Sequence, residues 1–227
     1  MFKIYNIVFI FVFLIFPTTL KSHVQHYENL KRIEFDIYRN NKLIGKHVFS
    51  FTKSEEKLLV NSEINFKIKK LGVVLYKYHV SGTEVYENGK LVKFNSKTKQ
   101  NGKEKYVNII SKNDENIIDG SSYKGKAPTD YLIGTWWNHS IIKSPAQISA
   151  VSGRIIKQKV TFIGEEVINY NGKNHKTLHF NFSSVDKKLG KDKKLNTDVW
   201  YDKETLNWVK ASFKKKGKWE YKLISIE

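Results

Sequence analysis

Three aromatic residues, Tyr131, Trp136 and Trp137, lie together at the one long interruption of an otherwise regular sequence pattern. Aromatic side chains bring large apolar surfaces, and at the mouth of a β-barrel they are well placed to contact an apolar ligand. The two tryptophans could instead close one end of a hydrophobic core. Tyr131, Trp136 and Trp137 are therefore our first candidate ligand-binding residues, with core packing as the alternative.

Two pairs of titratable residues share a four-residue spacing. On an extended strand that spacing is about 13 Å, which is too long for one metal ion and for the ~5–10 Å between a pair of glycosidase carboxylates. We therefore expect Asp202 to be a turn residue rather than a catalytic partner of Asp198. We also expect His175 and His179 to be solvated.

No motif for catalysis or cofactor binding accompanies these residues. The serines lack the G-x-S-x-G setting of a hydrolase nucleophile, and no glycine-rich phosphate loop precedes a helix. We therefore expect no catalytic residue, no metal site and no cofactor, and we favour a protein that is not an enzyme. A hydrolase would need Asp130, His139 or Asp198 to converge in one cleft.

The composition is strongly basic. The 227 residues include 40 Lys and Arg against 22 Asp and Glu, which gives a formal net charge of +18, but only three of the basic residues are arginine. Arginine is preferred for bidentate phosphate and base contacts, so we expect no nucleic acid partner. We expect either a generally solvated basic surface or contact with an anionic surface of the cell envelope. The lysine-rich run 214–218 should be a solvated hairpin tip.

The first 22 residues have the features of a secretory signal peptide. Lys3 precedes an unbroken apolar run from 7 to 16, and Pro17 ends that run. The run is about half of the ~20 residues that span a bilayer as a helix, so a retained anchor is the weaker interpretation. We expect cleavage near Ser22, a periplasmic or secreted protein, and a flexible lead-in over 23–31. The chain has no cysteine, hence no disulfide and no lipid-modified N-terminal cysteine, which suits a bacterial periplasm.

Alternation of apolar and polar residues dominates from residue 32 to the end of the chain. It is clearest between 58 and 69, where the pattern is typical of a strand with one buried face. Asn-Gly pairs at 88–89 and 101–102 are strong signals for tight hairpins. The sequence therefore predicts one all-β domain over residues 23–227. We expect a single antiparallel, strongly curved sheet or barrel-like domain of about ten to twelve strands.

The alternation stops between residues 121 and 152. The segment 127–130 can start a helical turn, and the apolar residues that follow are spaced by three to four. We predict a short helical insertion near 128–144, with an ordered loop as the alternative, and either could plug or cover the mouth of the curved sheet. Phe66, Tyr76 and Tyr78 face the predicted core and complete the candidate ligand-binding set.

Four segments occur in an order that resembles a known family. They are 35–45, 84–91, 135–138 and 198–202, with the sequences FDIYRNNKLIG, EVYENGKL, TWWN and DVWYD. Together they look like an uncharacterised family of exported bacterial proteins, known only as a domain of unknown function. The resemblance covers nearly the whole domain and implies export and a β-rich fold, but no activity. The architecture is also loosely similar to that of the periplasmic carriers of lipoproteins, which hold acyl chains in a half-closed barrel.

Three functional hypotheses follow from these observations. The first is a non-enzymatic periplasmic protein that binds an apolar or amphiphilic, lipid-like molecule of the envelope through the six aromatic residues named above. The second is an envelope assembly or scaffold protein that uses its basic surface, while side chains simply fill its interior. The third is the hydrolase, acting on a cell-wall or lipid substrate.

Overall fold

The computed structural model describes residue 27 and residues 29–54, 56–170, 172–190 and 193–227, so the predicted signal peptide lies outside the described residues. The first half of the chain forms eight strands in succession. They are β1 (Arg32–Arg39), β2 (Lys42–Ser54), β3 (Lys57–Lys70), β4 (Val73–Glu87), β5 (Lys90–Gln100), β6 (Lys103–Lys112), β7 (Glu115–Gly120) and β8 (Lys124–Pro128).

Among its described residues, the second half adds seven strands and the short 3₁₀ helix η2. They are β9 (Leu132–Ile133), the helix η2 (His139–Lys143), β10 (Ala146–Ile148), β11 (Ile155–Tyr170), β12 (Lys173–Ser184), β13 (Asn196–Asp202), β14 (Trp208–Lys214) and β15 (Lys218–Ile226). Among the described residues, no helix has the length and apolar character needed to cross a membrane.

All fifteen strands belong to one sheet, in the order β8-β7-β6-β5-β4-β3-β2-β1-β15-β14-β13-β12-β11-β10-β9. The first and last strands, β1 and β15, are therefore neighbours near its middle. Neighbouring strands are antiparallel except β9 and β10, which run parallel. The two edge strands β8 and β9 are not joined by a ladder in the described part of the chain, so the sheet is open.

The predicted all-β class is confirmed, but the predicted strand number and the purely antiparallel pairing are wrong. The additional strands come mainly from the region between 121 and 152. There β8, β9 and β10 have five, two and three residues, too few for an alternating pattern to show in the sequence. β9 and β10 run parallel because the segment between them returns the chain to the same end of the sheet.

The predicted helical insertion near 128–144 is reduced to a single 3₁₀ helix, His139–Lys143, which Asn138 caps. A longer helix cannot form on the N-terminal side because Trp136 has a left-handed backbone, with φ of 61°. On the C-terminal side Pro145 follows the helix, and the residue before a proline disfavours helical geometry.

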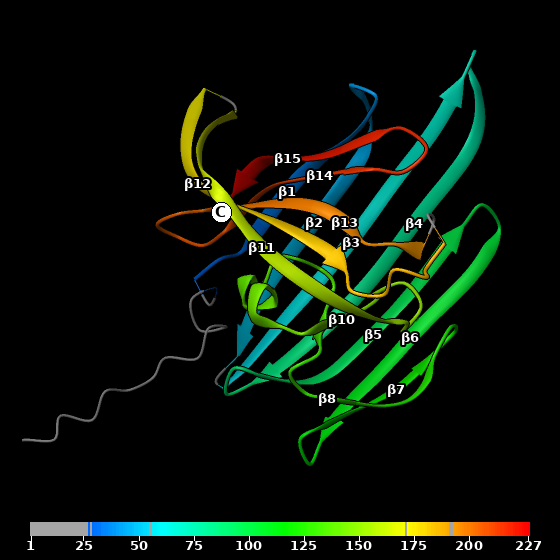
Figure 1. Cartoon of the computed structure of the whole chain (residues 1–227), viewed down its shortest axis with the longest axis vertical. Coiled ribbons are helices and arrows are strands. Elements are labelled where there is room, and N and C mark those ends of the chain that lie inside the picture. The colour runs from blue at the N-terminus through cyan, green and yellow to red at the C-terminus, as the bar shows by residue number, and fades with distance from the viewer. Residues whose placement is uncertain (1–26, 28, 55, 171, 191–192) are drawn as a thin grey trace, which may run out of the picture.

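The sheet curls so strongly that its two halves face each other. In Figure 1 the long strands β2–β6 form one wall, and β11–β15 cross in front of it. The main hydrophobic core lies between these halves and includes Phe35, Phe49 and Trp208. A smaller cluster joins Phe94 of β5 to Ile148 of β10. The segment that connects β8 to β11 therefore lies inside the curl.

The hairpins follow the turn chemistry of the sequence. Asn88 and Gly89 have φ of 48° and 74°, the left-handed values that two-residue hairpin turns with the right twist require. The longest hairpin is β3–β4, with strands of 14 and 15 residues. Its tip at Leu71 and Gly72 extends past the ends of the other strands, at the upper right of Figure 1.

Candidate functional site

A pocket of about 200 Å³ lies inside the curl of the sheet. Its walls come from the inner faces of β2–β5, from residues 134–136, from the chain around β10 and from β15. Two of the predicted ligand-binding residues, Tyr78 and Trp136, belong to the lining. Phe94 and Tyr221 add two further aromatic rings, and small, aliphatic and polar residues such as Val80, Ser96 and Gln147 complete the lining.

His47 lines the pocket and is itself surrounded by aromatic rings. It is 4% exposed, and its ring lies 4.2 Å from that of Phe49 and 5.9 Å from those of Trp208 and Tyr221. Its Nε2 lies 2.9 Å from Oγ of Ser62, whereas Nδ1 has no hydrogen-bond partner in the described structure. Burial lowers the pKa of His47 to about 3, so the ring is neutral near pH 7.

Trp136 is fixed at the pocket by hydrogen bonds on both sides. The Glu84 carboxylate accepts hydrogen bonds from Thr135 Oγ1 at 3.0 Å and from Trp137 Nε1 at 2.8 Å. The hydroxyl of Tyr201 donates to the Trp136 carbonyl at 3.0 Å. A positive φ is a strained conformation for so bulky a residue, and these bonds hold the backbone in it.

We call this arrangement the Glu84 clamp: Glu84 with its three donors Thr135, Trp137 and Tyr86. Tyr86 donates its hydroxyl hydrogen to the other carboxylate oxygen at 2.5 Å. Glu84 is only 1% exposed. Burial raises the pKa of its carboxyl group, and the three hydrogen bonds act in the opposite direction. The clamp thus connects β4 to the segment that carries Trp136.

Two indole N–H groups at this site have no acceptor among the described residues, those of Trp136 and Trp208. Their rings are 5.7 Å apart and nearly perpendicular. The other three tryptophans donate to protein acceptors: Trp137 to Glu84, Trp200 to Glu166, and Trp219 to the carbonyl of Lys215. Buried polar groups are normally hydrogen-bonded. Both Trp136 and His47 line the pocket, so two of the unpartnered buried groups belong to residues of its wall.

Phe66, Tyr76 and Tyr78 form a stacked series on the inner face of the β3–β4 hairpin. Phe66 stacks on Tyr78 at 4.7 Å and on Tyr76 at 6.0 Å, and the ring of Trp219 meets it edge-on at 5.3 Å. Tyr78 lines the pocket, Phe66 is its direct cross-strand neighbour, and Tyr76 lies two residues nearer the hairpin tip. An aromatic surface therefore leads from the pocket toward that tip.

The other two predicted ligand-binding residues lie elsewhere. Trp137 is fully buried and packs edge-on against Tyr27, Phe51 and Tyr86. This placement matches the alternative in which a tryptophan closes the core. Tyr131 is half-buried and packs against the smaller hydrophobic cluster. A ligand contact by Tyr131 or Trp137 stays a prediction.

Tyr27 does not belong to a flexible lead-in, contrary to our expectation for 23–31. Its side chain is fully buried, and its hydroxyl lies 2.8 Å from His139 Nδ1 and donates to the carbonyl of Leu206 at 3.1 Å. It thereby joins η2 to the turn between β13 and β14. A single tyrosine ahead of the first strand carries no periodic signal, so the sequence did not reveal this anchor.

The three residues that a hydrolase would need do not converge. Asp130 is exposed in the turn between β8 and β9, and His139 is buried against Tyr27. Asp198 lies on the outer face of β13, 3.2 Å from Nε2 of His179. Within the ranges that the structure describes, no group of three His, Asp or Glu side chains is arranged to hold a metal ion.

The expected solvated histidines are instead covered. His175 is 9% exposed, with Nδ1 3.4 Å from Asp202. His179 stacks on Trp200 with 4.1 Å between ring centroids. The polar face of β12 is covered by long side chains of neighbouring strands, which alternation alone does not reveal. Asp202 accepts hydrogen bonds from the backbone of the following turn, so its predicted role as a turn residue is confirmed.

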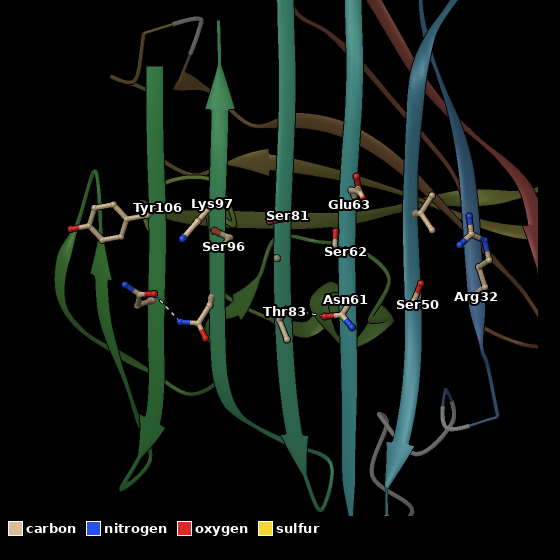
Figure 2. A pocket seen from close by; sticks show the side chains of 14 residues that line it. Arg32, Ser50, Asn61, Ser62, Glu63, Ser81, Thr83, Ser96, Lys97 and Tyr106 are labelled. Atoms are coloured by element: carbon tan, nitrogen blue, oxygen red, sulfur yellow. Dashed lines mark hydrogen bonds between the residues drawn. The ribbon is translucent and has the colours of Figure 1, made fainter. Parts of the chain in front are cut away.

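A larger hollow, about 680 Å³, lies on the outer face of the sheet and has a different chemistry (Figure 2). One row of cross-strand neighbours runs through it: Ser50, Asn61, Thr83, Asn95 and Asn108. These short, uncharged side chains bond in pairs, Thr83 to Asn61 at 2.8 Å and Asn95 to Asn108 at 2.7 Å. The hollow is therefore suited to a polar partner and not to an apolar one.

Sequence reasoning did not single out His47, Glu84 or Tyr221 for the site. For His47 and Glu84 the sequence pattern did contain a signal. His47 shares the apolar face of its strand with Phe49 and Phe51, and Glu84 stands on the same face as Tyr86. A titratable residue at a core position of an alternating strand is a rare event; His47 lies in the lining of the pocket, and Glu84 holds the segment beside it.

The open, strongly curled sheet with an internal pocket defines a β-barrel-like protein. The crystal structure of a β-barrel-like protein of DUF1849 from Brucella abortus is similar to it, with a TM-score of 0.62 and 11% identity over 87% of this chain and 97% of that one. The domain of unknown function DUF6134 matches residues 35–224, so the chain belongs to that family. This confirms the resemblance to a family of unknown function.

A DUF1329 family protein from Desulfovibrio piger ATCC 29098 is matched over 91% of this chain and 90% of its own, with a TM-score of 0.19 and 10% identity. No curated protein matches the chain.

Proposed function

We propose that this protein binds a small amphiphilic molecule of the cell envelope in the pocket inside the curled sheet, outside the cytoplasm and without catalysing a reaction. The observation that carries the proposal is Trp136, whose strained backbone is fixed by the Glu84 clamp and by Tyr201. Strained residues persist only where their surroundings hold them, and they are concentrated at binding and active sites.

The volume of the pocket limits the apolar part of the ligand. A cavity of about 150 Å³ holds one benzene molecule, whereas drug-sized ligands occupy about 300–1,000 Å³. The pocket, at about 200 Å³, therefore accepts one ring or a short aliphatic segment. A longer lipid-like molecule would place one such segment in the pocket and the rest along Tyr78, Phe66 and Tyr76.

The polar groups of the pocket limit the other part of the ligand. The neutral ring of His47 offers Nδ1, and Trp136 offers an indole N–H. A hydroxyl, carbonyl or ether oxygen matches these groups. A charged group would be buried without a counter-charge, at a cost of several kcal/mol or a shift of its pKa. We therefore expect a ligand whose buried polar group is neutral.

Filling the pocket from its wall tests this proposal. A Cβ added at Gly82 would meet Phe94 and Ser96 of the inner face at 3.5 Å, an ordinary contact distance. The larger side chain of Gly82→Val should therefore extend into the pocket and weaken binding at least about tenfold. Gly190→Val is the matched control, because the surroundings of Gly190 are open. Calorimetric titration of delipidated protein with benzyl alcohol and 1-hexanol measures the effect.

Two results would contradict the proposal. One is equal binding by the wild-type protein and both glycine variants. The other is no binding of either alcohol by delipidated wild-type protein, together with no molecule found by mass spectrometry in the extract from delipidation. A titration with hexanoate tests whether the buried polar group of the ligand must be neutral. We expect hexanoate, which carries a charged carboxylate, to bind more weakly than 1-hexanol.

A second candidate function is assembly or scaffolding in the envelope through the outer face. The outer hollow favours it, because at about 680 Å³ it is far larger than the internal pocket of about 200 Å³. Its central row is uncharged although the chain has a net charge of +18, so a neutral hydroxylated polymer fits that row better than an anionic one. Co-sedimentation with cell-wall polymer at low and high salt distinguishes a neutral polymer from an anionic one. Salt screens the contacts of exposed lysines, so it should weaken binding of an anionic polymer and leave binding of a neutral polymer unchanged.

A further inference from the structure

The β3–β4 hairpin ends in a cluster of exposed apolar side chains, which we call the apolar tip: Leu71, Val73, Val74 and Leu75. They are 95%, 63%, 37% and 53% exposed. Leu43, from the neighbouring β1–β2 hairpin, is 56% exposed and lines a surface hollow with residues 65–67 and 69 of β3, close to the tip. Single exposed apolar residues are ordinary, but a contiguous group of them marks an interaction site.

Lysines surround the apolar tip. Lys67, Lys69 and Lys70 lie on β3 and Lys77 on β4, and all four are exposed. The chain from 64 to 83 contains these four lysines and no Asp or Glu. The ion pairs of the described residues involve other lysines. The end of the hairpin is therefore both apolar and positively charged.

We propose that the apolar tip docks this protein on a bilayer surface that contains anionic lipid. Apolar side chains at a narrow projecting end can enter the headgroup region, where lysines contact lipid phosphates and extend their stems along the interface. Each lysine near an anionic membrane surface strengthens binding by about fivefold. The position of the tip beyond the ends of the other strands leaves it free to reach a flat surface (Figure 1).

Docking in this way would place the stacked aromatic residues of the hairpin between the bilayer and the pocket. Phe66, Tyr76 and Tyr78 lead from the pocket toward the apolar tip, so an amphiphile could pass between bilayer and pocket along apolar surface. The docking itself does not depend on the pocket, because it follows from the exposed residues of the hairpin alone. Either proposal can therefore fail without the other.

A matched pair of substitutions tests the docking. Val73 in the tip is 63% exposed, and Val167 on β11 is 62% exposed. Val73→Glu and Val167→Glu change the net charge equally and differ only in their place on the molecule. We measure sedimentation with vesicles of phosphatidylcholine alone or mixed with phosphatidylglycerol. We expect the wild-type protein to bind only the mixed vesicles, Val73→Glu to bind them at least about tenfold more weakly, and Val167→Glu to bind within about twofold of wild type.

A fluorescent label reports where the tip goes. The chain has no cysteine, so Leu71→Cys and, as a control, Val167→Cys can each carry one environment-sensitive fluorophore. A blue shift with mixed vesicles at position 71 and none at position 167 would support the proposal. Equal weakening of vesicle binding by both glutamate variants, an equal shift at both labelled positions, or no binding of the wild-type protein to mixed vesicles would overturn it. Thermal unfolding confirms that each variant is folded.

Discussion

At the scale of single residues, His47 has the most unusual environment in the site. Aromatic rings of Phe35, Phe49, Trp208 and Tyr221 lie around it, and Ser62 is its hydrogen-bond partner. No carboxylate among the described residues pairs with it. Burial therefore keeps the ring neutral, which suits the neutral ligand that we propose and makes the folded protein less stable in acid.

We expect the stability of the protein to fall below pH 6.5 because of His47. Its pKa is about 3 in the folded state and ~6.5 in the unfolded state. Above pH 6.5 both states are neutral, whereas between 6.5 and 3 only the unfolded state binds the proton. The free energy of unfolding should therefore drop by up to about 1.4 kcal/mol per pH unit as the pH falls from 6.5. Urea unfolding at pH 7 and pH 5 measures this.

His47→Phe is the control for this prediction, since phenylalanine keeps a ring among its aromatic neighbours and cannot be protonated. The pairs of His175 and His179 with carboxylates are present in both proteins and cancel in the comparison. The difference between the two proteins in free energy of unfolding should change by about 2 kcal/mol between pH 6.5 and pH 5. An identical pH dependence of both proteins would show that burial does not keep His47 neutral.

At the scale of elements, the Glu84 clamp decides where the segment 134–138 lies. The segment is short, irregular and inside the curl, so its own sequence gives it little preference for one conformation. One carboxylate on β4 accepts from donors on both sides of Trp136 and so fixes that residue between them. The long strand thereby fixes the loop that carries Trp136, the side chain on which our proposal of ligand binding rests.

Removing the clamp should destabilise the protein strongly. Glu84→Ala leaves three buried donors without their acceptor, and we expect a loss of about 3 kcal/mol or more in urea unfolding. Glu84→Gln should cost far less, because its carbonyl oxygen can accept from Thr135 and Trp137 while its amide donates to the Tyr86 oxygen. Glu63→Ala on the exposed outer face is the control, with an expected change within about 0.5 kcal/mol. Equal losses for the alanine and glutamine variants would speak against the clamp.

The elements also show which parts of the fold the sequence could reveal. Strands such as β3 and β4 are long, alternate clearly and meet in recognisable turns, so their number and pairing could be predicted. β9 and β10 contain two and three residues, and their position depends on contacts with β5 and β6 that are distant in the sequence. Trp136 could be chosen as a candidate because two tryptophans at a break are conspicuous. Its partner Glu84, 52 positions earlier, could not be inferred without the register of the sheet.

At the scale of the whole molecule, the curl of one open sheet creates two surfaces with different chemistry. The inside holds a small aromatic pocket with a neutral histidine, and the outside carries the uncharged polar row of the outer hollow. The β3–β4 hairpin connects the inside with an apolar, lysine-rich end. We interpret the molecule as a receptor for a small amphiphile, oriented toward a membrane by its longest hairpin.

The central claim is that the pocket binds a ligand beside Trp136, and the five tryptophans of the chain allow a direct test. Their indole N–H groups give separate signals in a ¹H–¹⁵N correlation spectrum, to be followed while 1-hexanol is added. We expect a saturable shift for Trp136, a smaller one for its neighbour Trp208, and none for Trp137, Trp200 and Trp219, whose N–H groups already have acceptors. Unchanged signals throughout, or equal shifts of all five without saturation, would contradict the account.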